Sequence, residues 1–178
     1  MEFRSPRAEE IDVRIGSINQ KGITLLLYQD ARVGMTILDE TVKPENWQRK
    51  HELINGNLFC SVGINVNYGQ DKEPCWVWKQ DVGVESLTEK EKGQASDSFK
   101  RAVVNWGICR ELYSAPFIWI KAEDANINQG GNGKFQCYDK FVVEQILYDE
   151  NRNIVALSIR NATKKKRVFL MDNRKKET

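Results

Sequence analysis

The segment spanning residues 92–113 constrains the fold of this chain more than any other part of the sequence. Its apolar residues recur at helical spacing and fall on one side of the helix: Ala95, Phe99, Ala102, Val103 and Trp106. Thr88 can cap this helix, and Glu91, three residues later, is the reciprocal partner of a capping box. Because an apolar stripe must be buried, the sequence predicts a helix packed beside a sheet.

The same helix carries basic residues next to its apolar stripe. At about 100° per residue, Lys100 and Arg101 fall on the two sides of the polar face. Lys92 borders the stripe on the same side as Lys100. A sheltered basic flank of this kind can hold phosphate groups. The alternative is an ordinary solvated face, and the pattern alone favours neither.

Three strands are predicted ahead of this helix. Residues 47–54 and 57–68 have strand character and are joined at Asn55-Gly56, a strong signal for a tight hairpin turn. A polar loop then leads to a third strand at residues 75–82. Three antiparallel strands followed by a helix make a β-β-β-α core, so the predicted fold class is α+β.

The N-terminal part is predicted to form a hairpin and a first helix. Residues 11–15 alternate between apolar and polar, and residues 23–28 form a continuous apolar strand after a turn at 19–22. Asp30 is placed to cap a helix that runs to about Val42 and is stopped by Pro44. The residues expected to face inward are Met35, Leu38 and Val42.

The C-terminal part is predicted to form a small sheet. The strands are expected at residues 135–148, 154–160 and 167–171, after a glycine-rich loop at 126–134 and with a turn at 149–153. This sheet could pack on the core or on a neighbouring subunit. We expect residues 1–178 to be a single domain, with a core of about 10–120 and a C-terminal sheet and basic tail of about 121–178.

Charge is distributed unevenly along the chain. The net charge is only +2, but residues 161–178 hold seven basic side chains against two carboxylates. A basic tail on a mildly acidic body can be a nucleic-acid arm. The alternative is a solubilising hairpin turn and chain end, which the composition favours over the arm.

The sequence offers no catalytic constellation, so we expect a binding protein and not an enzyme, with no metal and no cofactor. It lacks a phosphate-binding GxxxxGK[ST] loop, and His51 is the single histidine. Four carboxylates could in principle bind magnesium but show no spacing that brings them together: Asp81, Glu85, Asp97 and Glu111. The four cysteines form no CxxC pair and are expected as reduced thiols.

Membrane association and export are not expected. There is no run of about 18 apolar residues that could span a bilayer. The first residues contain no apolar segment typical of a secretory signal. The expected location is the cytoplasm or nucleoid of a bacterial host.

Four landmarks occur in order along the chain: 28-YQDAR-32, Asn46-Trp47, 81-DVG-83, and the 92–113 block with its SDSFKRA core. In these the chain resembles the Rad fifty-two family of single-strand annealing proteins, in its bacterial and phage branch. The resemblance covers about residues 10–120. It implies a ring-shaped homo-oligomer that binds single-stranded DNA in an outer groove and anneals complementary strands without ATP.

The resemblance also implies the residues of that groove. The positions that match the family's basic residues are Arg32, Lys92, Lys100 and Arg101. The chain departs from the family at Val104, where eukaryotic members carry a further arginine. Annealing needs no bond making, because backbone contacts that leave the base edges free are enough.

We therefore expect ATP-independent binding and annealing of single-stranded DNA in recombination and repair, by a phage-encoded protein. A single-strand binding protein is a further expected partner. The alternative is a protein that coats or protects single strands without annealing them. Trp76 and Trp78 share a strand face, where they could stack on bases, be buried between sheet and helix, or lie at a subunit interface.

Overall fold

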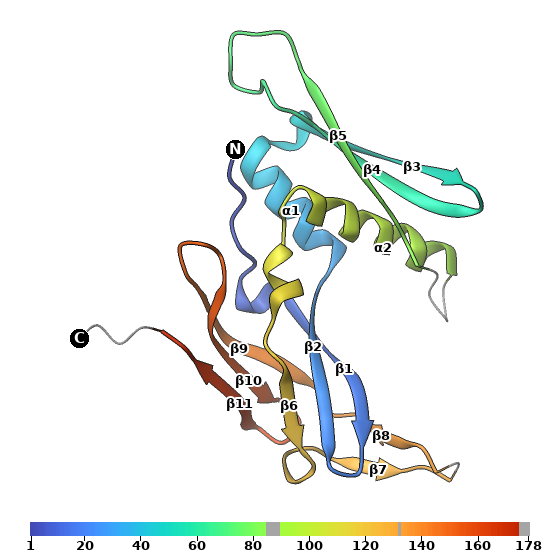
Figure 1. Cartoon of the computed structure of the whole chain (residues 1–178), viewed down its shortest axis with the longest axis vertical. Coiled ribbons are helices and arrows are strands. Elements are labelled where there is room, and N and C mark those ends of the chain that lie inside the picture. Colours follow the sequence, from blue (N-terminus) through green and yellow to red (C-terminus); the bar gives the residue numbers. More distant parts are fainter. Residues whose placement is uncertain (85–89, 132, 175–178) are drawn as a thin grey trace. The chain divides into compact units, whose positions relative to one another are not determined.

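The computed structural model describes residues 1–84, 90–131 and 133–174, apart from the side chains of residues 90–92. The predicted capping residue Thr88 and the side chains of Glu91 and Lys92 lie outside the described residues. Contacts within the chain define two compact units. Unit 1 contains residues 1–5 and 29–110, and unit 2 contains residues 6–28 and 111–178. Each is described by itself (Figure 1).

Unit 1 contains a three-stranded antiparallel sheet followed by a long helix. The sheet order is β3-β4-β5, with strands β3 (Trp47–Ile54), β4 (Asn57–Asn65) and β5 (Trp76–Val82). The helix α2 (Lys90–Asn105) follows and lies along this sheet (Figure 1). The order of elements predicted from the sequence is therefore present, and the α+β class is confirmed.

Asn55 and Gly56 form the turn between β3 and β4, as predicted. Both residues have positive φ, 51° and 77°, as a two-residue hairpin turn of type I′ requires. The pairing runs without interruption from Ile54↔Asn57 to Trp47↔Ile64. The turn thus sets which side chains of the hairpin share a face.

One face of this sheet is covered by α2. Val62 of β4 stands between Arg49 of β3 and Lys79 of β5. The Arg49 guanidinium lies 4.9 Å from the centroid of the Phe99 ring, and the Lys79 Nζ lies 4.6 Å from that of Trp106. The β4 side chains on this inner face are fully buried: Cys60, Val62 and Ile64.

Gly83 allows the chain after β5 to pass directly against α2. A Cβ at this position would lie 2.1 Å from the Gln94 carbonyl oxygen and 2.8 Å from the Ser98 nitrogen. The Gln94 side chain also donates to the Gly83 carbonyl at 3.2 Å. Any side chain at position 83 would therefore push β5 and α2 apart.

The first helix, α1 (Ala31–Val42), begins where the sequence predicts. The Asp30 side chain caps it by accepting a hydrogen bond from the Arg32 backbone nitrogen at 2.8 Å. The short 3-10 turn η2 (Pro44–Asn46) follows. The buried residues of α1 are Val33, Gly34, Ile37, Leu38 and Val42.

The inward face of α1 was predicted only in part. Leu38 and Val42 are buried as expected, but Met35 is only partly buried. The buried stripe is turned because α1 packs on α2 through Gly34, where an added Cβ would lie 3.2 Å from Val103. The contact with α2 determines which side of α1 is buried, and the periodicity of the sequence does not reveal that contact.

The second strand of the hairpin is shorter than predicted, ending at residue 65 and not at 68. The Asn65 side chain explains the end, because its oxygen accepts from the backbone nitrogens of Asn67 and Cys75 at 3.2 and 3.0 Å. A side chain that bonds nearby backbone in this way competes with strand pairing.

Unit 2 is built around a six-stranded antiparallel sheet of order β11-β10-β9-β1-β2-β6. A short 3-10 turn, η1 (Ala8–Glu10), precedes the first strand. The strands are β1 (Ile11–Asn19), β2 (Gly22–Gln29), β6 (Ile118–Lys121), β9 (Phe141–Tyr148), β10 (Ile154–Asn161) and β11 (Lys166–Asp172). The C-terminal strands thus join the N-terminal hairpin in one sheet.

A separate two-stranded hairpin corrects the prediction for residues 126–148. It consists of β7 (Ile127–Gln129) and β8 (Phe135–Cys137), so the predicted loop contains a strand and the predicted long strand is divided. The division falls at Asp139, whose carboxylate accepts from Asn126 and from Asn161 at 2.7 Å. These side-chain bonds replace strand pairing at that point.

Two further 3-10 turns are η3 (Arg110–Ser114), which lies in unit 2 from Glu111 onward, and η4 (Ala122–Asp124). η3 carries Glu111, whose side chain is only 3% exposed and forms an ion pair with Arg152. The Arg152 Nε donates to the Glu111 carboxylate at 2.6 Å. This pair joins η3 to the turn between β9 and β10.

Candidate nucleic-acid interface

The basic flank of α2 is positioned by the apolar stripe on its other side. Phe99, Ala102 and Val103 are completely buried, as predicted, while Ala95 and Trp106 are partly buried. Trp106 is fixed by a hydrogen bond from its indole nitrogen to the Val62 carbonyl at 3.0 Å. This packing fixes the rotation of α2 and hence the direction of its basic residues.

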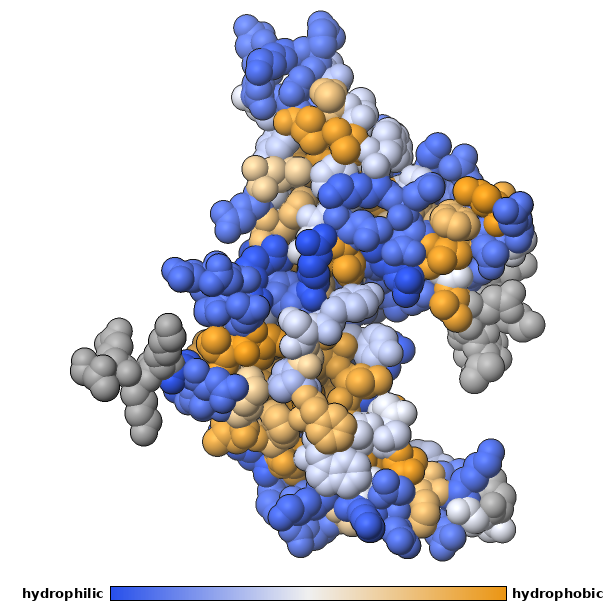
Figure 2. Space-filling view, viewed as in Figure 1, coloured by the Kyte–Doolittle hydropathy of each residue, from blue (hydrophilic) through white to orange (hydrophobic). Residues whose placement is uncertain are grey.

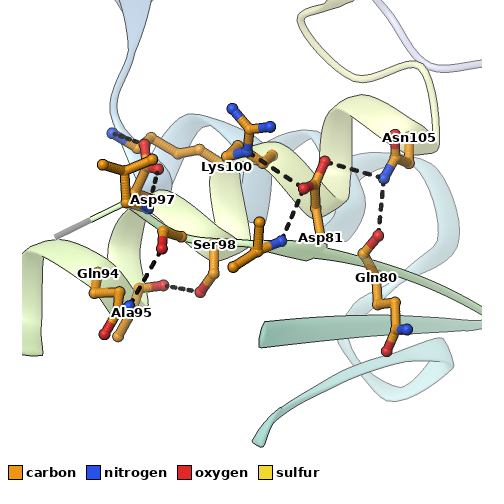
Figure 3. Close-up of polar contacts among 12 residues, drawn as sticks. Gln80, Asp81, Gln94, Ala95, Asp97, Ser98, Lys100 and Asn105 are labelled. Atoms are coloured by element: carbon orange, nitrogen blue, oxygen red, sulfur yellow. Dashed lines mark hydrogen bonds and ion pairs between the residues drawn. The ribbon is translucent and has the colours of Figure 1, made fainter. Parts of the chain in front are cut away.

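Lys100 is sheltered and paired. Its side chain is 18% exposed, and its Nζ lies 3.9 Å from the Asp97 carboxylate one turn earlier. Asp97 also accepts a hydrogen bond from the Val84 backbone nitrogen at 3.0 Å, so it ties α2 to the segment after β5. Figure 3 shows Lys100 and Asp97 on the same side of the helix.

Arg101 is paired with a carboxylate of the neighbouring strand. Its Nε lies 3.3 Å from the Asp81 carboxylate of β5. Asn105 donates to the same carboxylate at 3.4 Å and to the Gln80 carbonyl at 3.0 Å. Lys100 and Arg101 therefore belong to two separate polar groups, one around Asp97 of α2 and one around Asp81 of β5 (Figure 3).

Arg32 lies in the first turn of α1 and is exposed. The chain just before it meets α2 at the position of Lys100, because the Gln29 side chain donates to the Lys100 carbonyl at 3.4 Å. The start of α1 and the middle of α2 are thus neighbours within unit 1. The fourth predicted residue, Lys92, belongs to the first turn of α2, and its side chain lies outside the described residues.

Two cations that the sequence analysis missed flank the same helix. Arg49 of β3 and Lys79 of β5 are both exposed and lie over the rings of Phe99 in α2 and of Trp106 directly after α2. Lys79 also donates to the Asn105 carbonyl at 2.9 Å, a favourable place for a cation at a helix C-terminus. The register set by the Asn55-Gly56 turn places Arg49 opposite Val62, whereas Lys79 lies on β5, whose register that turn does not set.

The two tryptophans of β5 lie on the other face of the sheet. Trp76 and Trp78 pair with Asn65 and Gly63, which alternate with the residues that face α2. Burial between sheet and helix, one of the three alternatives for these tryptophans, is therefore wrong. Their rings lie 6.4 Å apart, and Trp78 is 41% exposed.

Four basic residues of the tail have polar partners in the structure. Lys166 and Arg167 form ion pairs with Asp124 and Glu144 at 2.5 and 2.7 Å, and Lys164 donates to the Glu123 carbonyl. Arg174 forms an ion pair with its neighbour Asp172 and lowers the pKa of that carboxyl to about 2. Such pairs do not distinguish a nucleic-acid arm from a solubilising turn and chain end, so both interpretations stay predictions.

Residues with potential for other chemistry have structural partners. Within the described ranges, no group of three or more His, Cys, Asp or Glu is placed to hold a metal ion. His51 contacts the Ala95 carbonyl at 3.2 Å. All four cysteines are free thiols, and burial raises the pKa of the Cys60 thiol to about 11 despite the nearby Arg49.

Among the described helices, none has the length and apolar character needed to cross a membrane.

A comparison with curated proteins adds a relative. The chain is 32% identical over 103 residues to the protein "Single-stranded DNA-binding protein DdrA" of Deinococcus radiodurans. The chain is similar to a protein that binds single-stranded DNA. The match covers 57% of this chain and 46% of the relative, so the chain spans about half the length of that protein. No family model and no solved structure matches the chain.

Proposed function

We propose that this protein binds single-stranded DNA along the basic flank of α2 and anneals complementary strands without ATP. The observation that carries the proposal is the similarity to a single-stranded DNA-binding protein of Deinococcus radiodurans. The placement of Lys100 and Arg101 at successive positions on the polar face of a helix that packs on the sheet supports it. The resemblance to the Rad fifty-two family is the basis for proposing the annealing step and the ring-shaped homo-oligomer.

The two ion pairs of α2 suit a reversible contact with phosphate. Lys100 and Arg101 lie 3.9 and 3.3 Å from the carboxylates of Asp97 and Asp81. A DNA phosphate can replace the carboxylate as the partner of each cation. Because the carboxylates compete with phosphate, the net free energy of DNA binding is reduced. Annealing requires this balance, because a strand that is held too tightly cannot pair with its complement.

Weak contacts in each subunit favour an assembly. A ring would hold one strand through many equal contacts, and such avidity needs no strong individual site. The proposal therefore includes a homo-oligomer, action as a binding protein without catalysis, and a location in the bacterial cytoplasm. Phage origin and a partnership with a single-strand binding protein belong to the same proposal.

The test measures the pairing of two complementary labelled oligonucleotides by energy transfer. We expect the protein to raise the pairing rate equally with and without ATP. The second candidate, a coating protein, would bind both strands and leave the pairing rate unchanged or lower. A rate that requires ATP hydrolysis by the pure protein would contradict the proposal, as would magnesium-dependent loss of the labelled strands.

A further inference from the structure

The face of the unit 1 sheet that is turned away from α2, here called the outer face, carries two tryptophans among polar groups. Trp78 and Gly63 form a row with Gln48 of β3. The next row consists of Lys50, Ser61 and Gln80. The order of these side chains follows directly from the antiparallel register.

Trp78 lies flat on this face. A Cβ at Gly63 would lie 2.8 Å from three atoms of the Trp78 indole, so the ring rests on the Gly63 backbone. One side of the indole is thereby covered, and 41% of the residue remains exposed. A flat indole with an exposed surface is a platform on which another planar ring can stack.

The surroundings of Trp78 favour a polyanion over a protein partner. The Lys50 Nζ lies 5.5 Å from the centroid of the Trp78 ring and forms an ion pair with Glu52 at 3.4 Å. Ser61 and Gln80, joined by a hydrogen bond of 3.4 Å, supply hydroxyl and amide groups. Lysine is depleted in protein–protein interfaces, whereas nucleic-acid surfaces combine basic and aromatic side chains.

We propose that the outer face is a base-stacking platform for single-stranded DNA. It rests on the proposed function and adds a second contact surface to it, on the face of the sheet opposite α2. Trp78 and Trp76 stack on bases, and Lys50 meets an adjacent phosphate. The centroids of the two tryptophan rings are 6.4 Å apart, and the ring planes are inclined by 32°.

The test compares two single strands of equal length that differ only in their bases. One is an oligothymidine, and the other is an abasic strand of sugar and phosphate. We expect Trp78→Ala to bind oligothymidine on the order of tenfold more weakly than the parent and to bind the abasic strand equally well. Trp78→Phe should recover most of the loss. Leu53→Ala, a change at another exposed apolar residue of the same sheet, should alter neither affinity.

Each outcome decides the proposal. If the parent binds both strands and Trp78→Ala binds them as the parent does, the platform is wrong and the proposed function stands. If the parent binds neither strand, both fail. A change in assembly mass in Trp78→Ala would instead identify the outer face as a subunit contact. Should Trp78→Ala not fold, as judged by circular dichroism, the comparison of Trp76→Ala with Trp76→Phe takes its place.

Discussion

The Lys100 side chain forms only a weak ion pair within the protein. A separation of 3.9 Å between its Nζ and the Asp97 carboxylate exceeds that of a strong charged hydrogen bond. We therefore predict that Lys100→Ala folds normally and loses about one phosphate contact per subunit, with Arg32→Ala behaving likewise. The slope of log affinity against log salt should fall by about 0.7 for each contact. A salt titration of binding to labelled oligothymidine measures it.

A matched control for this loss of charge is Lys121→Ala, since Lys121 lies in unit 2 and its side chain is 72% exposed. Its salt slope should equal that of the parent. Asp81→Asn should act in the opposite direction to Lys100→Ala, because it removes a carboxylate that competes for Arg101. Unchanged salt slopes in both Lys100→Ala and Arg32→Ala would show that the flank of α2 is only a solvated surface.

At the scale of elements, the Glu111–Arg152 pair fastens η3 to the turn between β9 and β10. The carboxylate is 3% exposed and its partner 30% exposed, so removing Arg152 takes away the ion pair of a buried carboxylate. We predict that Arg152→Ala lowers the free energy of unfolding by about 3 kcal/mol. Urea unfolding followed by circular dichroism measures the change.

The control is Arg174→Ala, which breaks the exposed pair with Asp172 and should leave the unfolding midpoint unchanged. The double change of Glu111→Gln with Arg152→Ala should recover part of the stability, because the buried charge is then gone. If Arg152→Ala is as stable as the parent, water solvates Glu111 and the pair contributes little.

Much of the element order was predictable from short-range signals. The Asn55-Gly56 turn and the Asp30 cap act within a few residues, and both are present where the sequence places them. The phase of α1 and the end of β4 were not predictable, because they depend on Gly34 against α2 and on the bonds of Asn65. Periodicity shows that a face is apolar but not which neighbour covers it.

The same limit applies to the candidate site. The sequence locates Lys100 and Arg101 on one helix, but their pairing with Asp97 and Asp81 follows from how α2 lies on β5. Trp76 and Trp78 were correctly placed on one face. Alternation along a strand shows which residues share a face, but not whether that face meets α2 or solvent. The pairing register of the whole sheet was needed to decide this.

At the scale of the whole molecule, assembly depends on a surface that copies of the chain could share. Apolar residues gather on the outside of unit 2 over β2 and β6, where Leu26, Tyr28 and Phe117 are 45%, 38% and 76% exposed (Figure 2). Phe117 stacks on Trp119 with ring centroids 6.5 Å apart. An exposed patch of this kind is typical of a protein–protein contact.

We predict that the parent is a homo-oligomer at micromolar concentration and that Phe117→Glu lowers its mass, because a charge would then be buried in the contact. Light scattering with and without oligonucleotide measures the mass. Leu53→Glu is the control, since Leu53 is 73% exposed but lies on the unit 1 hairpin. A monomeric parent under both conditions would refute the ring, and a Phe117→Glu variant of full mass would place the contact elsewhere.

The pairing of β1 with β9 has a consequence for how the chain is made. The partners Asp12 and Val142 are 130 residues apart in sequence, whereas unit 1 is almost one continuous segment, residues 29–110. On the ribosome, unit 1 can form while the first hairpin still lacks its partner strand. Until β9 emerges, β1 presents an open edge of the kind that recruits other chains into aggregates. A chain that terminates before β9 would therefore contain a folded unit 1 and an aggregation-prone hairpin of β1 and β2.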